Sequence, residues 1–80
     1  MSHTPHELPE EFPQHVEVMH RLKESDAHFA RLFDDYYEVN NLVFRGETNI
    51  EPMDDEFMEG LRRKRMKLKD DIWAMLRAAS

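Results

Sequence analysis

Five histidines in a chain of 80 residues are the first side chains that could do chemistry, because imidazole is a common zinc ligand. His15 and His20 are five residues apart, so their rings would point to different sides of a helix. His28 stands alone, and His3 and His6 fall in a polar N-terminal stretch without periodicity. We therefore expect no physiological metal site and no cofactor.

Carboxylate pairs and missing nucleophiles argue against catalysis. Asp34 with Asp35, and Asp70 with Asp71, are neighbours in sequence and therefore diverge on a helix. The sequence has no GxSxG motif, no glycine-rich phosphate loop and no cysteine. We expect no enzymatic activity and no catalytic residues. The lack of cysteine also removes disulfides and thiolate metal sites, and it fits a reducing compartment.

A run of bases in the second half of the chain could bind a charged partner: Arg62, Arg63, Lys64, Lys67 and Lys69. On a helix these side chains face several directions, and the net charge of the chain is −6. General binding of nucleic-acid phosphates needs a surplus of bases. We expect a solvated face with local ion pairs, Glu59 with Arg63 and Lys67 with Asp71. Contact with nucleic acid or the ribosome is the alternative.

The elements that carry these residues follow from two apolar stripes with steps of three and four residues. One contains Met19, Leu22, Asp26, Phe29, Phe33, Tyr36, Asn40 and Val43, and the other contains Met58, Leu61, Arg65, Leu68, Ile72 and Met75. They predict an all-α antiparallel hairpin, with a helix over about 13–45, a loop over 46–53 and a helix over about 54–77. Residues 1–7 are expected to form a flexible terminus, and residues 8–80 a single domain.

Proline, glycine and aspartate set the expected ends of the helices. Pro13 suits the first position of the long helix, which leaves Leu8 and Pro9 free to fold back as a short separate turn. Gly46 suits a left-handed C-cap, and Asp54 can cap the second helix.

Three polar residues interrupt the apolar stripes: Asp26 and Asn40 in the first, and Arg65 in the second. A polar residue at a helix seam costs stability and commonly fixes register or oligomeric state. We interpret the three residues in this way and not as ligands. The expected register of the hairpin places Arg65 opposite Phe33.

The apolar surface exceeds what two helices can bury against each other. Six side chains lie beside the stripes: Leu32, Val39, Tyr37, Phe44, Met66 and Trp73. A chain this short buries only about 60% of the surface that its unfolded form exposes. We therefore predict that hairpins associate, most simply as a dimer that forms a four-helix bundle. An unidentified protein partner is the alternative.

No apolar run approaches the ~20 residues that span a bilayer. Residues 1–12 are acidic and lack the apolar centre of a signal peptide. We expect a cytoplasmic protein that does not associate with membranes.

Three blocks of sequence stand out: Leu8-Pro9-Glu10-Glu11-Phe12-Pro13, Asp26-Ala27-His28-Phe29 and Lys67-Leu68-Lys69-Asp70. On these blocks the chain resembles the YdcH-like family of small bacterial proteins, over nearly its whole length. Gly46 departs from the apolar residue that the family pattern has there. The resemblance implies a helical hairpin in a bacterial cytoplasm. The family has no established biochemical activity, so no catalytic residue is carried over.

Overall fold

The computed structural model describes residues 5–48 and 53–79. Within these residues the chain forms α1 (Leu8–Glu11), the 3-10 helix η1 (Pro13–His15), α2 (Val16–Ser25), α3 (Ala27–Glu47) and α4 (Asp55–Ala79). No described residue lies in a strand, so the prediction of an all-α protein is confirmed. None of the described helices combines the length and the apolar character needed to cross a membrane.

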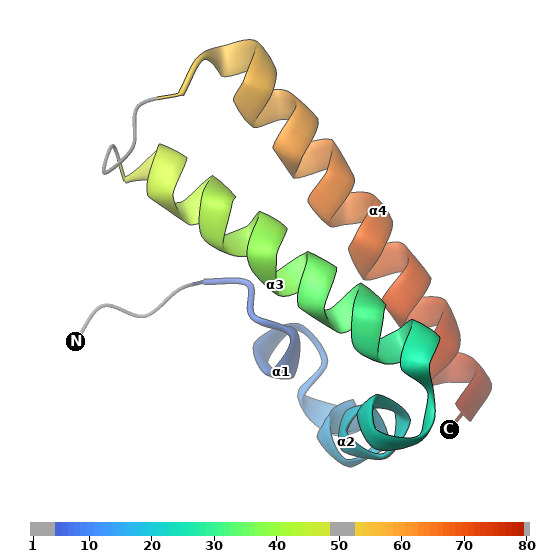
Figure 1. The fold of residues 1–80 in the computed structure, drawn as a ribbon. Coiled ribbons are helices and arrows are strands. Elements are labelled where there is room, and N and C mark those ends of the chain that lie inside the picture. The colour runs from blue at the N-terminus through green and yellow to red at the C-terminus, as the bar shows by residue number, and fades with distance from the viewer. Residues whose placement is uncertain (1–4, 49–52, 80) are drawn as a thin grey trace.

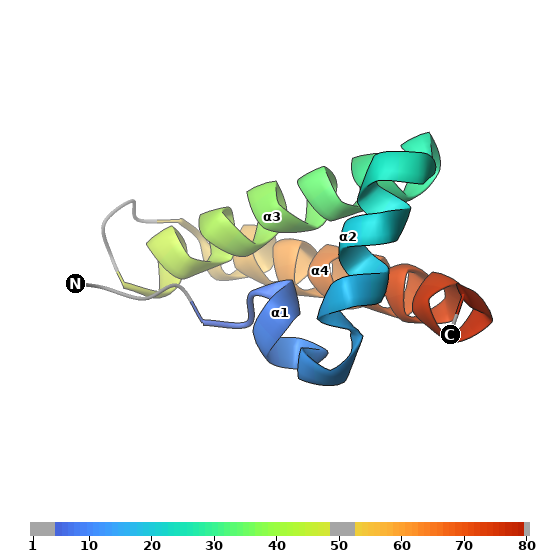
Figure 2. The same ribbon diagram turned by 90° about the horizontal axis from the view of Figure 1, so that it is seen from below.

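Helices α3 and α4 lie side by side and run in opposite directions as an antiparallel hairpin (Figure 1). Residues 5–25, which we call the arm, contain α1, η1 and α2 and lie across one face of this hairpin (Figure 2). Of the predicted loop, residues 49–52 lie outside the described residues, and α3 continues through Glu47. The chain is therefore a hairpin with a docked arm.

The prediction of a single helix over about 13–45 is wrong, because the helix is interrupted at Asp26. This residue is extended, with φ −129° and ψ 108°, between two helices. Its carboxylate accepts hydrogen bonds from the backbone N–H groups of His28 (2.9 Å) and Phe29 (3.2 Å). Such a side chain offers the backbone an alternative to the continuous helical ladder. Asp26 thus begins α3 as its N-cap.

The prediction of a flexible terminus over 1–7 is wrong for residues 5–7, which lie on the hairpin. Residues 1–4 lie outside the described part. His6 adopts a left-handed backbone conformation, with φ 62°, which is uncommon for a residue other than glycine. The carbonyls of Pro5 and His6 accept hydrogen bonds from side chains of α3. These contacts fix the start of the arm on the hairpin.

The core lies where the arm meets the hairpin. Its largest fully buried side chains come from α3 and α4, and they are Phe29, Tyr36, Val43, Ile72 and Leu76. The arm contributes Leu8 and Met19, each only 3% exposed. Burial of side chains of this size stabilises a fold by roughly 1.5–3 kcal/mol each. The arm is therefore an integral part of the core.

Gly46 does not form the predicted left-handed C-cap. It lies inside α3, and no described glycine has a positive φ. A Cβ added at Gly46 would come within 2.9 Å of the terminal methyl of Met58 and closer still to its sulfur. Glycine at this position lets the Met58 side chain approach the backbone of α3.

Helix α4 begins as predicted, because the Asp54 carboxylate accepts a hydrogen bond from the backbone N–H of Phe57 at 2.8 Å. This bond satisfies one of the free donors at the helix N-terminus. The prediction of Asp54 as the N-cap is confirmed.

Candidate functional site

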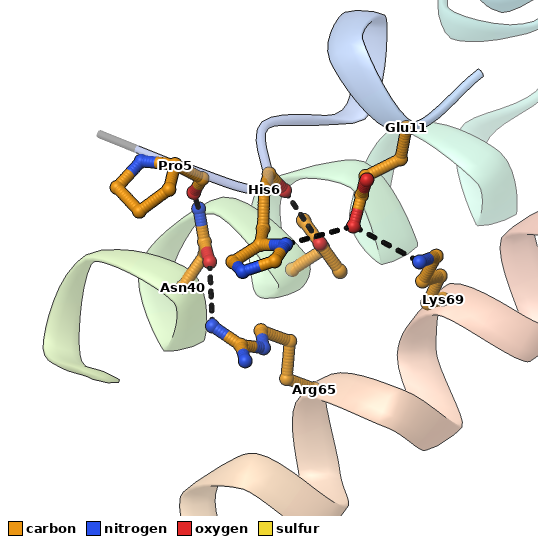
Figure 3. A network of polar contacts seen from close by, with 7 residues as sticks. Pro5, His6, Glu11, Asn40, Arg65 and Lys69 are labelled. Atoms are coloured by element: carbon orange, nitrogen blue, oxygen red, sulfur yellow. Dashed lines mark hydrogen bonds and ion pairs between the residues drawn. The ribbon is translucent and has the colours of Figure 1, made fainter. Parts of the chain in front are cut away.

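The contact between the arm and the hairpin contains a buried amide that bonds in two directions. Asn40 is 2% exposed, and its Nδ2 donates to the Pro5 carbonyl at 2.9 Å. Its Oδ1 accepts from a guanidinium nitrogen of Arg65 at 3.1 Å (Figure 3). Asn40 therefore joins α3 to both α4 and the arm. The predicted register, with Arg65 opposite Phe33, is wrong because Arg65 lies opposite Asn40.

One turn earlier on α3, Tyr36 is 1% exposed and donates its hydroxyl hydrogen to the His6 carbonyl at 2.6 Å. The pKa of Tyr36 is raised to about 12, mainly by burial and also by the Glu11 charge, while the Arg65 charge opposes the shift. Ionisation would place an uncompensated charge in the core. Tyr36 is thus a neutral donor at ordinary pH, aimed at the backbone of the arm.

Glu11 provides the charged link between the arm and α4. Its Oε1 accepts from Lys69 Nζ at 2.9 Å and lies 3.1 Å from His6 Nδ1 (Figure 3). The hydrogen bond from Lys69 lowers the pKa of Glu11, with a further lowering by His6, and partial burial opposes both. The carboxylate is therefore held in its charged form between the arm and the hairpin.

Trp73 is covered by the arm of its own chain. The Phe12 ring stacks on it with centroids 5.3 Å apart and planes 2° apart, and His15 meets it edge-on at 5.2 Å. Aromatic pairs at such distances are favourable beyond their buried area. Trp73 was predicted to face a second subunit or a protein partner, and the arm of the same chain, which that prediction did not place over α4, covers part of it.

The other predicted interface residues divide into two groups. Leu32 and Val39 are 9% and 4% exposed, so they belong to the core of the single chain. The prediction that they lie on an exposed flank is wrong. Tyr37 and Met66 are 51% and 61% exposed, and Phe44 is half-buried. Phe57, 53% exposed, is a further large apolar side chain at the surface that the stripes did not single out.

Two of the three predicted polar seam residues bond to each other across the hairpin. Asn40 and Arg65 form the hydrogen bond described above. Asp26 does not lie at a helix seam, because its carboxylate turns back to cap α3. Its proposed role in register is withdrawn in favour of this local one.

The basic run on α4 is largely paired with acids. The predicted pairs are confirmed, with Arg63 2.7 Å from Glu59 and Lys67 2.8 Å from Asp71. Arg62 bonds to Glu47 of α3 at 3.1 Å. Lys69 bonds to Glu11, and Lys64 lines a surface hollow that also contains the carboxylates of Asp35 and Glu38. These pairs reduce the charge that the run presents to a partner.

A surface cavity of about 280 Å³ lies beside the polar network. Its walls come from both the arm and the hairpin: His6, Glu11, Tyr36, Arg62, Arg65, Met66 and Lys69. The described residues contain no group of three or more histidine, aspartate or glutamate side chains placed to hold a metal. The hydrogen-bond donors and aromatic rings described above hold the arm on the hairpin of the same chain.

Sequence reasoning missed that the arm docks at all. The signals present were the prolines at 9 and 13, which punctuate the arm, and Phe12 between them. Phe12 has an apolar side chain in a segment otherwise rich in acids, and it finds its partner on α4. Which surface such a segment covers depends on the tertiary fold and not on local pattern.

The described residues form a small all-α fold in which the arm packs on the hairpin of the same chain. A family profile described as "Protein of unknown function (DUF465)" matches residues 29–76, which is more than half of the chain. The protein belongs to this family. The match covers nearly all of the hairpin and begins three residues after Asp26, so the arm lies outside it. Comparison with curated proteins gave no match. Comparison with solved structures also gave none.

Proposed function

We propose that this protein is a small non-enzymatic interaction protein that acts by assembling with copies of itself, most simply as a dimer with a four-helix bundle. The observation that carries the proposal is the exposure of three large apolar side chains, Tyr37, Phe57 and Met66, each more than half accessible. Exposed aromatic and methionine side chains are typical of the centres of protein interfaces.

The size of the chain supports the same proposal. Eighty residues form a core of limited extent, and association is a common way in which small domains gain stability. The chain has no cysteine with which to form a disulfide instead. Association that covers Tyr37, Phe57 and Met66 would add apolar burial that the single chain does not achieve.

The pairing of the basic run gives less support to a nucleic-acid partner. Arg62, Arg63, Lys67 and Lys69 each bond to a carboxylate of the same chain. A phosphate would have to displace these acids before it could bind. Assignment to the YdcH-like proteins of the bacterial cytoplasm is part of this proposal, and it is supported by the sequence blocks at residues 8–13, 26–29 and 67–70.

The experiment compares single substitutions at the exposed apolar residues with a matched polar control. Tyr37→Ser and Met66→Ser are expected to raise the dissociation constant of the dimer by roughly tenfold each, the usual loss when an interface anchor is truncated. Glu38→Ser, at an exposed position next to Tyr37, is expected to leave it unchanged. Sedimentation equilibrium measures the constants. A chain that is monomeric at every concentration would contradict the proposal.

A further inference from the structure

The connection between the arm and α3 is a single residue that replaces part of a helical ladder. The backbone N–H of Asp26 donates to the Leu22 carbonyl, and the Asp26 carbonyl accepts from Ala30, as in a continuous helix. The backbone N–H groups of residues 28 and 29 would normally donate to carbonyls four residues earlier. Here they donate to the Asp26 carboxylate. One side chain therefore stands in for two helical hydrogen bonds.

The sequence on either side of this hinge is compatible with one straight helix. Met19, Leu22, Asp26, Phe29 and Phe33 keep steps of three and four residues across the break. Neither proline nor glycine occurs between residues 16 and 45. A straightened α2 and α3 would therefore keep a continuous apolar face. The sequence at the hinge is therefore compatible with a helical conformation as well as with the bent one described.

Straightening the hinge would remove the arm from its own hairpin. Several side chains of α3 and α4 would then lose the arm groups that they contact. The Tyr36 hydroxyl would lose the His6 carbonyl, and the Asn40 amide would lose the Pro5 carbonyl. Trp73 would lose its stacked Phe12 ring, and Lys69 would lose Glu11.

We propose that the chain exchanges its arm, so that residues 5–25 of one copy dock on α3 and α4 of a second copy. The occupant is specified by the structure, because the arm seen on the hairpin supplies every one of these partners and an identical arm would supply them equally. Exchange of an identical element is a low-cost route to a dimer. The inference rests on the proposed self-association and names the contacts that cross between copies.

The balance between closed monomer and exchanged dimer depends on the hinge, because the arm contacts are the same in both. The Asp26 cap stabilises the bent form, and a connection this short favours the open form. Asp26→Ala removes the cap and improves helix propensity, so it is expected to lower the dimer dissociation constant by roughly thirtyfold for the two hinges of a dimer. Asp26→Ser keeps a capping oxygen and is the matched control.

Zero-length carbodiimide coupling provides the direct test, because it joins an amine to a carboxylate that it touches. Unlabelled and ¹⁵N-labelled chains are unfolded together, refolded and coupled, and the Glu11–Lys69 peptides are analysed by mass spectrometry. Exchange predicts that about half of these peptides combine one labelled and one unlabelled partner, as random pairing requires. The Lys67–Asp71 pair, 2.8 Å apart on one helix, is the internal control and must stay within one label.

Lengthening the hinge provides a second test that does not depend on Asp26. Insertion of Gly-Ser-Gly after Ser25 lets the arm return to its own hairpin and is expected to eliminate the mixed-label Glu11–Lys69 peptides, with helicity by circular dichroism retained. A dimer whose Glu11–Lys69 peptides all carry one label would overturn arm exchange and leave the proposed self-association standing. Mixed-label Glu11–Lys69 peptides at an unchanged level after the insertion would contradict an exchange that is driven by the short hinge. A monomer at every concentration, also for Asp26→Ala, would overturn both.

Discussion

Removal of the Tyr36 hydroxyl separates the contribution of the arm contact from that of the surrounding core. Tyr36→Phe keeps the ring in its site and deletes the hydrogen bond to the His6 carbonyl, which is 2.6 Å long. A buried hydrogen bond of this kind contributes about 1 kcal/mol net. In a domain of this size that loss corresponds to a fall of ~4–8 °C in melting temperature.

The neighbouring residue supplies the matched control. Tyr37 is 51% exposed, so Tyr37→Phe deletes a hydroxyl at the surface and is expected to change the free energy of unfolding very little. Urea denaturation followed by circular dichroism, at one fixed chain concentration, gives both values. Equal stability of the two variants would refute the reasoning, because it would mean that the His6 carbonyl is not held by Tyr36.

Alkaline pH tests the same contact from the direction of ionisation. The pKa of Tyr36 is raised from 10.0 to about 12 by burial, so the folded state favours the protonated phenol. The contribution is complete below pH 10, where both states are protonated, and it is lost as the pH rises through 12. Wild-type protein is therefore expected to lose more stability over this window than Tyr36→Phe. Parallel curves would contradict the assignment.

Four further substitutions test other parts of the structure. The pKa of Glu11 is lowered, so the carboxylate contributes stability above its ordinary pKa of 4.5 and loses that contribution as the pH falls. The Glu11→Gln variant should therefore lose less stability than wild type on acidification, as measured by urea denaturation. Gly60→Ala should raise the free energy of unfolding by about 0.5–1 kcal/mol, since nothing lies near the added Cβ. Gly46→Ala should gain less in the same assay, because its Cβ meets a methionine of α4. Phe12→Ala should shift Trp73 fluorescence to longer wavelength by exposing the indole; an unchanged spectrum would contradict the stacking.

The hairpin could be predicted because its signals are local. Steps of three and four apolar residues mark α4 within about two residues of its observed ends, and the Asp54 cap precedes it. The ion pairs Glu59–Arg63 and Lys67–Asp71 follow from helical spacing alone. In each case both partners lie on the same helix or next to its end.

The arm could not be predicted because its signals are tertiary. The steps of three and four residues continue on both sides of Asp26, so the spacing does not distinguish a bend from a straight helix. The burial of Leu32 and Val39, and the cover over Trp73, belong to a fold in which the arm returns to the hairpin. Asn40 and Arg65 were recognisable as polar seam residues, but the third partner of their network, the Pro5 carbonyl, carries no sequence signal.

The solution mass of the wild-type chain tests the central claim, self-association, most directly. Light scattering behind size-exclusion chromatography, repeated over a wide range of loading concentrations, compares the mass with the 9.6 kDa of one chain. We predict a mass that approaches twice this value as concentration rises. A mass that stays at that of one chain throughout would contradict the claim.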